Sequence, residues 1–159
     1  AGLAEATRDI QETMGFTLLN DTMISLNDHL QLAGIADREH YGDKGKVDES
    51  QLFPNPDRSR YSILLKHRPL VDPWTARWVD LQLSGHSHGG QIFPFGLLVR
   101  LQFPYPDQTL VPIGDGTMRL YTSIGTGTWG PPLRLFKPGE VTLILISPES
   151  PPAIHSRQF

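Results

Sequence analysis

Three histidines in this sequence are candidate metal ligands: His67, His86 and His88. Neutral imidazole is the commonest protein ligand for borderline transition metals. His86 and His88 stand two residues apart in the segment Gly85-His86-Ser87-His88-Gly89-Gly90, so they can face two neighbouring ions. The glycines of this segment permit unusual backbone angles and a close approach of a ligand to the main chain. The sequence therefore predicts a metal site built on these three histidines.

Two predicted strands must position these histidines. An apolar run at residues 61–65 ends just before His67, and a strand at 81–84 leads directly into the Gly-His-Ser-His segment. Between them, Asp72 and Pro73 are typical of a helix N-cap and first position, and this helix should end near Asp80. A strand–helix–strand crossover of this length joins parallel strands. The histidines should therefore meet at the carboxyl edge of a sheet, where open α/β sheets bind ligands.

The rest of the chain is predicted to complete an α/β domain with short strands and many turns. Hydrophobic periodicity predicts a helix at residues 3–14 and strands at 16–19, 23–26, 30–36, 119–123 and 141–147. The stretches 37–50 and 91–106 carry Gly, Pro and polar residues and predict loops. Residues 148–159 are polar and Pro-rich, and we expect them to be a frayed tail outside a domain at 1–147.

The composition excludes several classes of protein. The 159 residues suffice for one domain with its own core. There is no cysteine, which excludes disulfides and a thiolate metal site. The formal net charge of −3, with no basic block, gives no signal for nucleic-acid binding. No apolar run in this chain is long enough to cross a bilayer.

A serine esterase is an alternative interpretation of the same residues. The segment Gly85-His86-Ser87-His88-Gly89 also matches the Gly-x-Ser-x-Gly nucleophile elbow, with His155 as base and Asp107 or Asp115 as acid. An elbow opens into a helix, however, and Pro94 would cost about 3 kcal/mol inside one. This alternative also leaves His67 unexplained, so the metal site is favoured.

A non-catalytic domain that binds a partner is a third interpretation. It would use Trp74, Trp78 and Trp129 as an adhesive surface. Large aromatic side chains belong more often to a core than to an interface, which counts against this interpretation.

Three segments resemble the calcineurin-like metallophosphoesterases. Residues 84–92, Ser-Gly-His-Ser-His-Gly-Gly-Gln-Ile, resemble the family signature Gly-His-Thr-His-Gly-Gly-Gln, with Ser87 in place of the usual Thr. Residues 63–69, Ile-Leu-Leu-Lys-His-Arg-Pro, resemble the strand of the family that ends in a ligand His. Residues 125–132, followed by Arg134 and Glu140, resemble a branch many of whose members carry N-terminal membrane segments. The resemblance covers nearly the whole chain.

This resemblance implies an α/β fold with a two-sheet β-sandwich flanked by helices. It also implies two divalent transition metal ions (Mn, Zn or Fe) bridged by an Asp, with His67 and His86 on one ion and His88 on the other. Two ions about 3.5–4 Å apart clamp a phosphoryl group and activate a bridging water to attack phosphorus. The backbone of Gly89 and Gly90 would help to shape a phosphate pocket. The implied activity is hydrolysis of a phosphomonoester or phosphodiester substrate, with no further catalytic residue assigned.

The chain departs from the family in one respect. The N-terminal motifs Asp-x-His, Gly-Asp-x-x-Asp and Gly-Asn-His-Asp or Glu are absent, and Asp37 lacks a partner His at their spacing. We therefore expect a C-terminal fragment that begins shortly after the Asn-His motif, binds metal weakly and is inactive and poorly stable alone. By analogy, the parent protein would be membrane-tethered and would act on lipid-linked phosphates.

Overall fold

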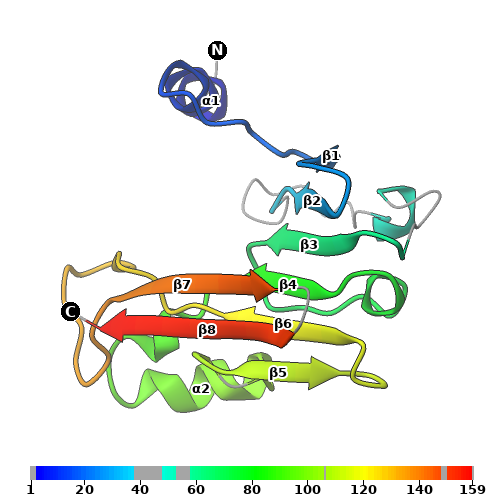
Figure 1. Cartoon of the computed structure of the whole chain (residues 1–159). Helices are drawn as coiled ribbons and strands as arrows, with labels where there is room; N and C mark the ends of the chain where they lie inside the picture. Colours follow the sequence, from blue (N-terminus) through cyan, green and yellow to red (C-terminus); the bar gives the residue numbers. More distant parts are fainter. Residues whose placement is uncertain (1–2, 38–47, 53–57, 106, 148–149, 159) are drawn as a thin grey trace.

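A six-stranded mixed sheet forms the centre of the chain (Figure 1). The computed structural model describes residues 3–37, 48–52, 58–105, 107–147 and 150–158, without the side chains of 3–7 and 150–152. The strand order is β1-β2-β3-β4-β6-β5. The strands are β1 (Thr22–Ser25), β2 (Leu30–Ile35), β3 (Tyr61–Lys66), β4 (Leu81–Ser84), β5 (Leu110–Ile113) and β6 (Met118–Thr122). Because β2, β3, β4 and β6 are parallel while β1 and β5 are antiparallel edges, the predicted α/β class is confirmed.

A second sheet consists of the antiparallel hairpin of β7 (Glu140–Ser147) and β8 (Ser150–Gln158). It packs on the face of β6, where the Tyr121 hydroxyl donates to Glu140 and lies 3.2 Å from the Thr142 hydroxyl (Figure 1). The expected frayed tail is wrong for residues 150–158, which form β8. The Pro151–Pro152 pair misled the interpretation, but an edge strand tolerates proline at its first residues.

The core lies on one face of the large sheet. The alternation of side chains along the strands places Ala33, Leu64 and Leu120 on this face, where Val79 and Met118 join them in one buried cluster. The opposite face is only partly covered, since Leu65 remains 38% exposed. A hollow of 650 Å³ on that face, lined by Leu18, Leu32, Leu65 and Leu83 among others, reaches His67.

Helices are few and short, and one was not predicted. Helix α1 (Leu3–Thr13) confirms the helix expected near the N-terminus. Helix α2 (Phe95–Gln102) occupies a stretch that was predicted to be a loop. It begins directly after Pro94, which is tolerated at a helix start although not in a helix interior. Among the described residues, no helix has the length and apolar character that a bilayer crossing requires.

The crossover between β3 and β4 contains less helix than predicted. Only the 3-10 turn η3 (Thr75–Arg77) forms, although the Asp72 carboxylate does accept the N–H groups of Trp74 and Thr75. The segment does end at Asp80 as predicted, where the Asp80 N–H donates to the Ser62 carbonyl and the Asp80 carboxylate accepts the Ser62 N–H. The strand expected at 16–19 is also absent. Elsewhere in the described part of the chain, short turns form at η2 (Glu49–Gln51) and η4 (His88–Gly90).

Candidate metal centre

The predicted histidines follow two adjacent parallel strands. Strand β3 ends at Lys66 and β4 ends at Ser84, with Leu65 paired to Leu83 in the parallel register. The loops beyond the strands are joined as well, since the Gly85 N–H donates to the His67 carbonyl at 2.9 Å. His67 and the Gly-His-Ser-His segment therefore leave the sheet side by side at its carboxyl edge.

Two of the three histidines face each other across this edge. His86 Nδ1 lies 3.0 Å from His67 Nε2, and the two rings are perpendicular with centroids 4.9 Å apart. His86 turns toward His67 because its backbone adopts φ +72°. On its other side the His86 ring packs edge-on against the buried Phe103, with centroids 5.4 Å apart. The position of His86 is therefore set by both backbone conformation and packing.

A carboxylate that was set aside in the sequence completes a three-residue group. Asp37 Oδ2 lies 3.9 Å from His67 Nε2, and one ligand atom each of Asp37, His67 and His86 fall within 4.8 Å of one another. Arg68 orients the carboxylate through Nε, which lies 3.1 Å from Asp37 Oδ1. Asp37 follows β2, whose parallel register pairs Ile35 with Lys66 and so brings Asp37 beside the residues after β3. Pairing the two predicted strands was the signal that could have found it.

His88 does not belong to this group. Its backbone adopts φ +49°, and its Nδ1 lies 3.5 Å from Arg134 Nη2. Arg134 Nη1 also donates to the His88 carbonyl at 3.4 Å. His88 is therefore held toward the loop after β6, and the two-ion arrangement of the three histidines stays a prediction.

The donor set of Asp37, His67 and His86 fits a divalent transition metal ion. Two imidazole nitrogens that face each other at 3.0 Å are held together by either a proton or a cation between them. Ligand bonds of about 2.0–2.1 Å would place two adjacent nitrogens about 3 Å apart. Burial, helped by repulsion from His67 and Arg68, lowers the pKa of His86, so this imidazole is neutral at pH 7 and can ligate.

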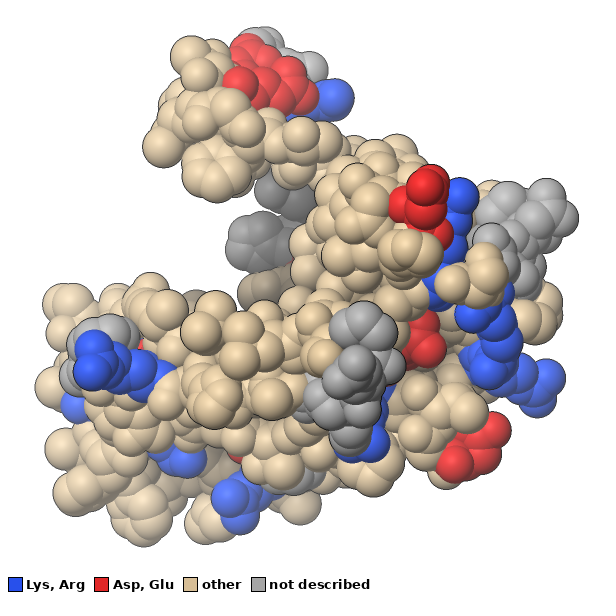
Figure 2. Space-filling model, in the orientation of Figure 1, with Lys and Arg blue, Asp and Glu red and all other residues tan. Residues whose placement is uncertain are grey.

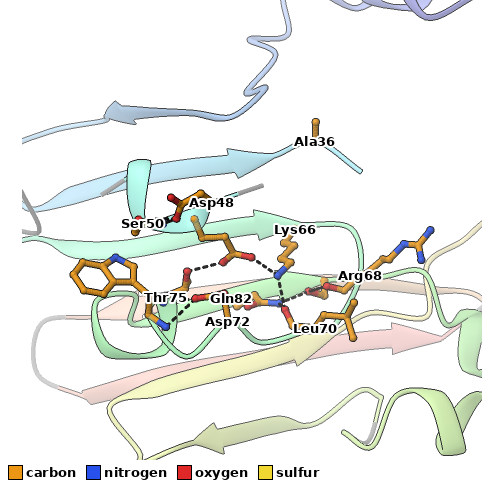
Figure 3. A network of polar contacts seen from close by, with 12 residues as sticks. Ala36, Asp48, Ser50, Lys66, Arg68, Leu70, Asp72, Thr75 and Gln82 are labelled. Carbon is orange, nitrogen blue, oxygen red and sulfur yellow. Dashed lines mark hydrogen bonds and ion pairs between the residues drawn. The ribbon is translucent and has the colours of Figure 1, made fainter. Parts of the chain in front are cut away.

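His67 lies in a segment whose ends, Lys66 and Leu70, are anchored by polar contacts (Figure 3). The buried carboxylate of Glu49 pairs with Lys66 Nζ at 2.5 Å and accepts from the Thr75 hydroxyl. Lys66 Nζ also donates to the Leu70 carbonyl at 2.6 Å. The side chain of Lys66 thus links the two ends of the segment from Lys66 to Leu70, which limits the positions that His67 can take.

Gly89 and Gly90 lie where the backbone conformation and close packing favour glycine. Both are buried and have positive φ, +63° and +77°. A Cβ on Gly90 would lie 2.2 Å from the Cα of Gly96 in the first turn of α2. They border an open hollow of 260 Å³ that Arg100 and Lys137 also line. The two cations suit an anion, but the N–H groups of Gly89 and Gly90 already donate to Ser87, and the predicted phosphate pocket stays a prediction.

A buried glutamine and a half-buried arginine fix the loop between β6 and β7. The Gln91 amide donates to the carbonyls of Trp129 (2.8 Å) and Pro131 (3.2 Å) and accepts the Trp129 N–H at 2.6 Å. The Arg134 guanidinium donates to the carbonyls of Ile124, Gly127 and His88. This loop is therefore tied to the Gly-His-Ser-His-Gly-Gly-Gln segment through both residues.

Ser87, His155 and Asp107 do not form the catalytic triad that the serine esterase alternative requires. Ser87 is 6% exposed, donates directly to Asp107 Oδ1 at 2.6 Å and accepts from the Gly89 N–H at 3.3 Å. A triad needs a histidine between serine and acid. The proposed base, His155, instead pairs with Leu143 in the β7–β8 hairpin. Ser87 therefore has the contacts of a structural residue that caps η4.

Relatives of known class match most of the chain. An uncharacterized metallophosphoesterase of Aquifex aeolicus is 36% identical over 141 residues, 87% of this chain and 53% of the relative. An uncharacterized metallophosphoesterase of Campylobacter jejuni is 40% identical over 76% of this chain and 34% of the relative. A transmembrane protein with metallophosphoesterase domain from Bos taurus is 34% identical over 76% of this chain and 28% of its own length.

These similarities, together with the α/β sheet and its histidine edge, define the class of protein. The chain belongs to the metallophosphoesterases, as its signature segments predicted. It spans about a third to a half of the bacterial relatives it matches. No protein-family model matches the chain, and no solved structure matches it.

Proposed function

We propose that this chain contributes ligands to a phosphoester hydrolase centre that uses divalent transition metal ions. The observation that carries the proposal is the convergence of His67 Nε2 and His86 Nδ1 at 3.0 Å, with the Asp37 carboxylate beside them. When bound, such ions polarise a phosphoryl group and lower the pKa of water, which favours hydrolysis at neutral pH. Manganese, zinc and iron all suit this donor set.

The residues of this chain would hold and orient the first ion. His67 and His86 supply neutral nitrogen ligands, and Asp37, oriented by Arg68, supplies the negative charge that lowers the cost of placing a cation there. The Glu49–Lys66 pair keeps His67 in place, while Phe103 keeps the His86 ring from rotating away. Preorganised ligands bind an ion more tightly than ligands that must first be ordered.

We further propose that His88 serves a second ion, as in the two-metal arrangement that the signature implies. His88 would have to exchange its contact with Arg134 for the ion, and further ligands would be needed beyond those of the described residues. Gly89, Gly90 and the nearby Arg100 and Lys137 would then face the phosphate. Relatives extend well beyond the matched region, and some are named transmembrane proteins, which supports a longer, membrane-tethered parent.

The full-length protein and this chain should be compared in one assay. Hydrolysis of an aryl phosphodiester and of an aryl phosphomonoester is measured with and without a chelator, beside the carboxylic ester of the same aryl alcohol. The proposal expects chelator-sensitive phosphoester hydrolysis that is lost in His86→Ala and retained in the turn variant His29→Ala. Hydrolysis of the carboxylic ester that ignores chelator and is lost in Ser87→Ala would instead support the serine esterase.

A further inference from the structure

Helix α2 and the loop 129–137 form one exposed apolar surface, here named the α2 surface. Helix α2 has no buried residue, and Leu101 is 84% exposed. In the loop, Trp129 and Phe136 are 78% and 81% exposed. The two segments lie side by side, because Leu97 of α2 and Phe136 of the loop line the same hollow. Leu98 of the helix and Phe93, two residues before its start, are also exposed.

Such a surface requires a partner. Large apolar side chains that gather on one side of a soluble protein mark an interaction site, whereas isolated ones need no explanation. The loop is also not free to fold these side chains inward, since Gln91 and Arg134 fix its backbone. The third interpretation of the sequence had offered Trp129 as part of an adhesive surface, and Trp129 is indeed exposed.

The charges around the α2 surface indicate which partner it fits. Arg100 and Lys137 line the hollow between α2 and the loop, and the carboxylate among its lining residues, Asp107, hydrogen-bonds to Ser87. Figure 2 shows Lys and Arg atoms with very few Asp or Glu atoms over the lower left of the molecule, where α2, the loop and the end of β8 lie. Aromatic and leucine side chains beside basic residues are typical of surfaces that lie in a bilayer interface. Protein interfaces, by contrast, are depleted of lysine.

We propose that the α2 surface docks on an anionic phospholipid bilayer. The leucines of α2 and the rings of Trp129 and Phe136 would enter the boundary between head groups and acyl chains, and Arg100 and Lys137 would contact lipid phosphates. Because Gly89 and Gly90 border the same hollow, docking would also turn the histidine edge toward the head groups. That orientation rests on the proposed function, whereas docking itself does not need a bound metal.

Vesicle binding tests the proposal, measured on the full-length protein and on the 159-residue chain once a cooperative urea transition shows that this chain is folded. Co-sedimentation is measured with vesicles of phosphatidylcholine, with and without phosphatidylglycerol, in the presence of a chelator. The chain should bind the anionic vesicles and bind pure phosphatidylcholine more weakly. The double variant Leu98→Ser/Leu101→Ser should lower the partition coefficient by at least about tenfold. Arg100→Glu should weaken binding to the anionic vesicles only, while Leu143→Ser, an equally exposed change on β7, should leave it unaltered.

A second measurement keeps the proposal falsifiable if the leucine variants fold poorly. In the parent chain, brominated lipids should quench Trp129, and the quenching should disappear in Trp129→Phe while Trp74→Phe retains it. Absence of quenching, or equal vesicle binding by the parent and the double leucine variant, overturns the proposal. So does a dimer in the absence of lipid that the double variant dissociates, because a second copy would then cover the surface. Vesicle binding in the presence of chelator would still support docking if the protein hydrolysed no phosphoester, so the failure of one proposal can be distinguished from the failure of the other.

Discussion

Replacing Gly90 with alanine should strongly destabilise the chain. A Cβ at this position would lie 2.2 Å from the Cα and 2.4 Å from the backbone N of Gly96. Carbon atoms in contact are normally about 3.5–4.0 Å apart, so η4 and the first turn of α2 would have to separate by more than about 1 Å. Both atoms belong to the backbone, so no side-chain rotation can relieve the clash.

The magnitude has two parts. Alanine at a φ of +77° costs about 1–2 kcal/mol relative to glycine. Overpacking against a fixed neighbour adds about 1–3 kcal/mol. The expected loss of about 2–5 kcal/mol is a large share of the 5–15 kcal/mol that typically separates folded and unfolded domains.

A matched variant separates the two parts. Gly114→Ala imposes the same backbone conformation, at φ +62°, but nothing lies within 4 Å of the added methyl group. Urea unfolding of both variants, followed by circular dichroism, gives the two free-energy differences. Gly114→Ala should lose only about 1–2 kcal/mol. If Gly90→Ala loses no more than Gly114→Ala, the close approach of η4 and α2 does not exist as described.

Three other predictions concern stability. Gln91→Ala removes three hydrogen bonds to the loop at Trp129 and should cost about 2–4 kcal/mol by urea unfolding, with the loop becoming cleavable by protease; an uncut loop would count against this role. Burial, reinforced by the hydrogen bond to Glu140, raises the pKa of Tyr121 to about 12. The pKa of Tyr121 in the folded chain therefore exceeds the value of about 10 in the unfolded chain, so the stability that the neutral hydroxyl contributes is complete below pH 10 and is lost as the pH rises to 12. In a pH series of unfolding curves, Tyr121→Phe should show a smaller decrease in the free energy of unfolding over this range. Glu49→Ala leaves the ammonium of Lys66 without its carboxylate and should cost about 3–5 kcal/mol, whereas Glu49→Leu combined with Lys66→Met should recover most of it; an equal loss in both would contradict the pairing.

The strands that carry the histidines could be predicted because both are apolar runs with clear ends. The predicted strand at 81–84 matches β4, and the one at 61–65 falls one residue short of β3. Strands β5 and β8 were missed because Pro112 and the Pro151–Pro152 pair indicate loops, although edge strands accept proline. Helix α2 was missed because it has no polar face and follows a proline.

Only part of the site could be predicted from the sequence. The parallel crossover brings His67 and the Gly-His-Ser-His segment together, and the structure places His86 against His67. The role of Asp37 depends on the pairing of β2 with β3, which links positions far apart in the sequence. The turn of His88 toward Arg134 depends on individual backbone angles, which residue types do not specify.

Metal binding by the chain itself decides whether Asp37, His67 and His86 form a metal site. Equilibrium dialysis against zinc or manganese, followed by elemental analysis, gives the number of bound ions and their affinity for the parent chain, His86→Ala, Asp37→Ala and the control His29→Ala. The account predicts one weakly bound ion per chain, lost in His86→Ala, weakened in Asp37→Ala and retained in His29→Ala. Binding that is equal in all four proteins would contradict it, because the ion would then be held elsewhere than at the edge of β3 and β4.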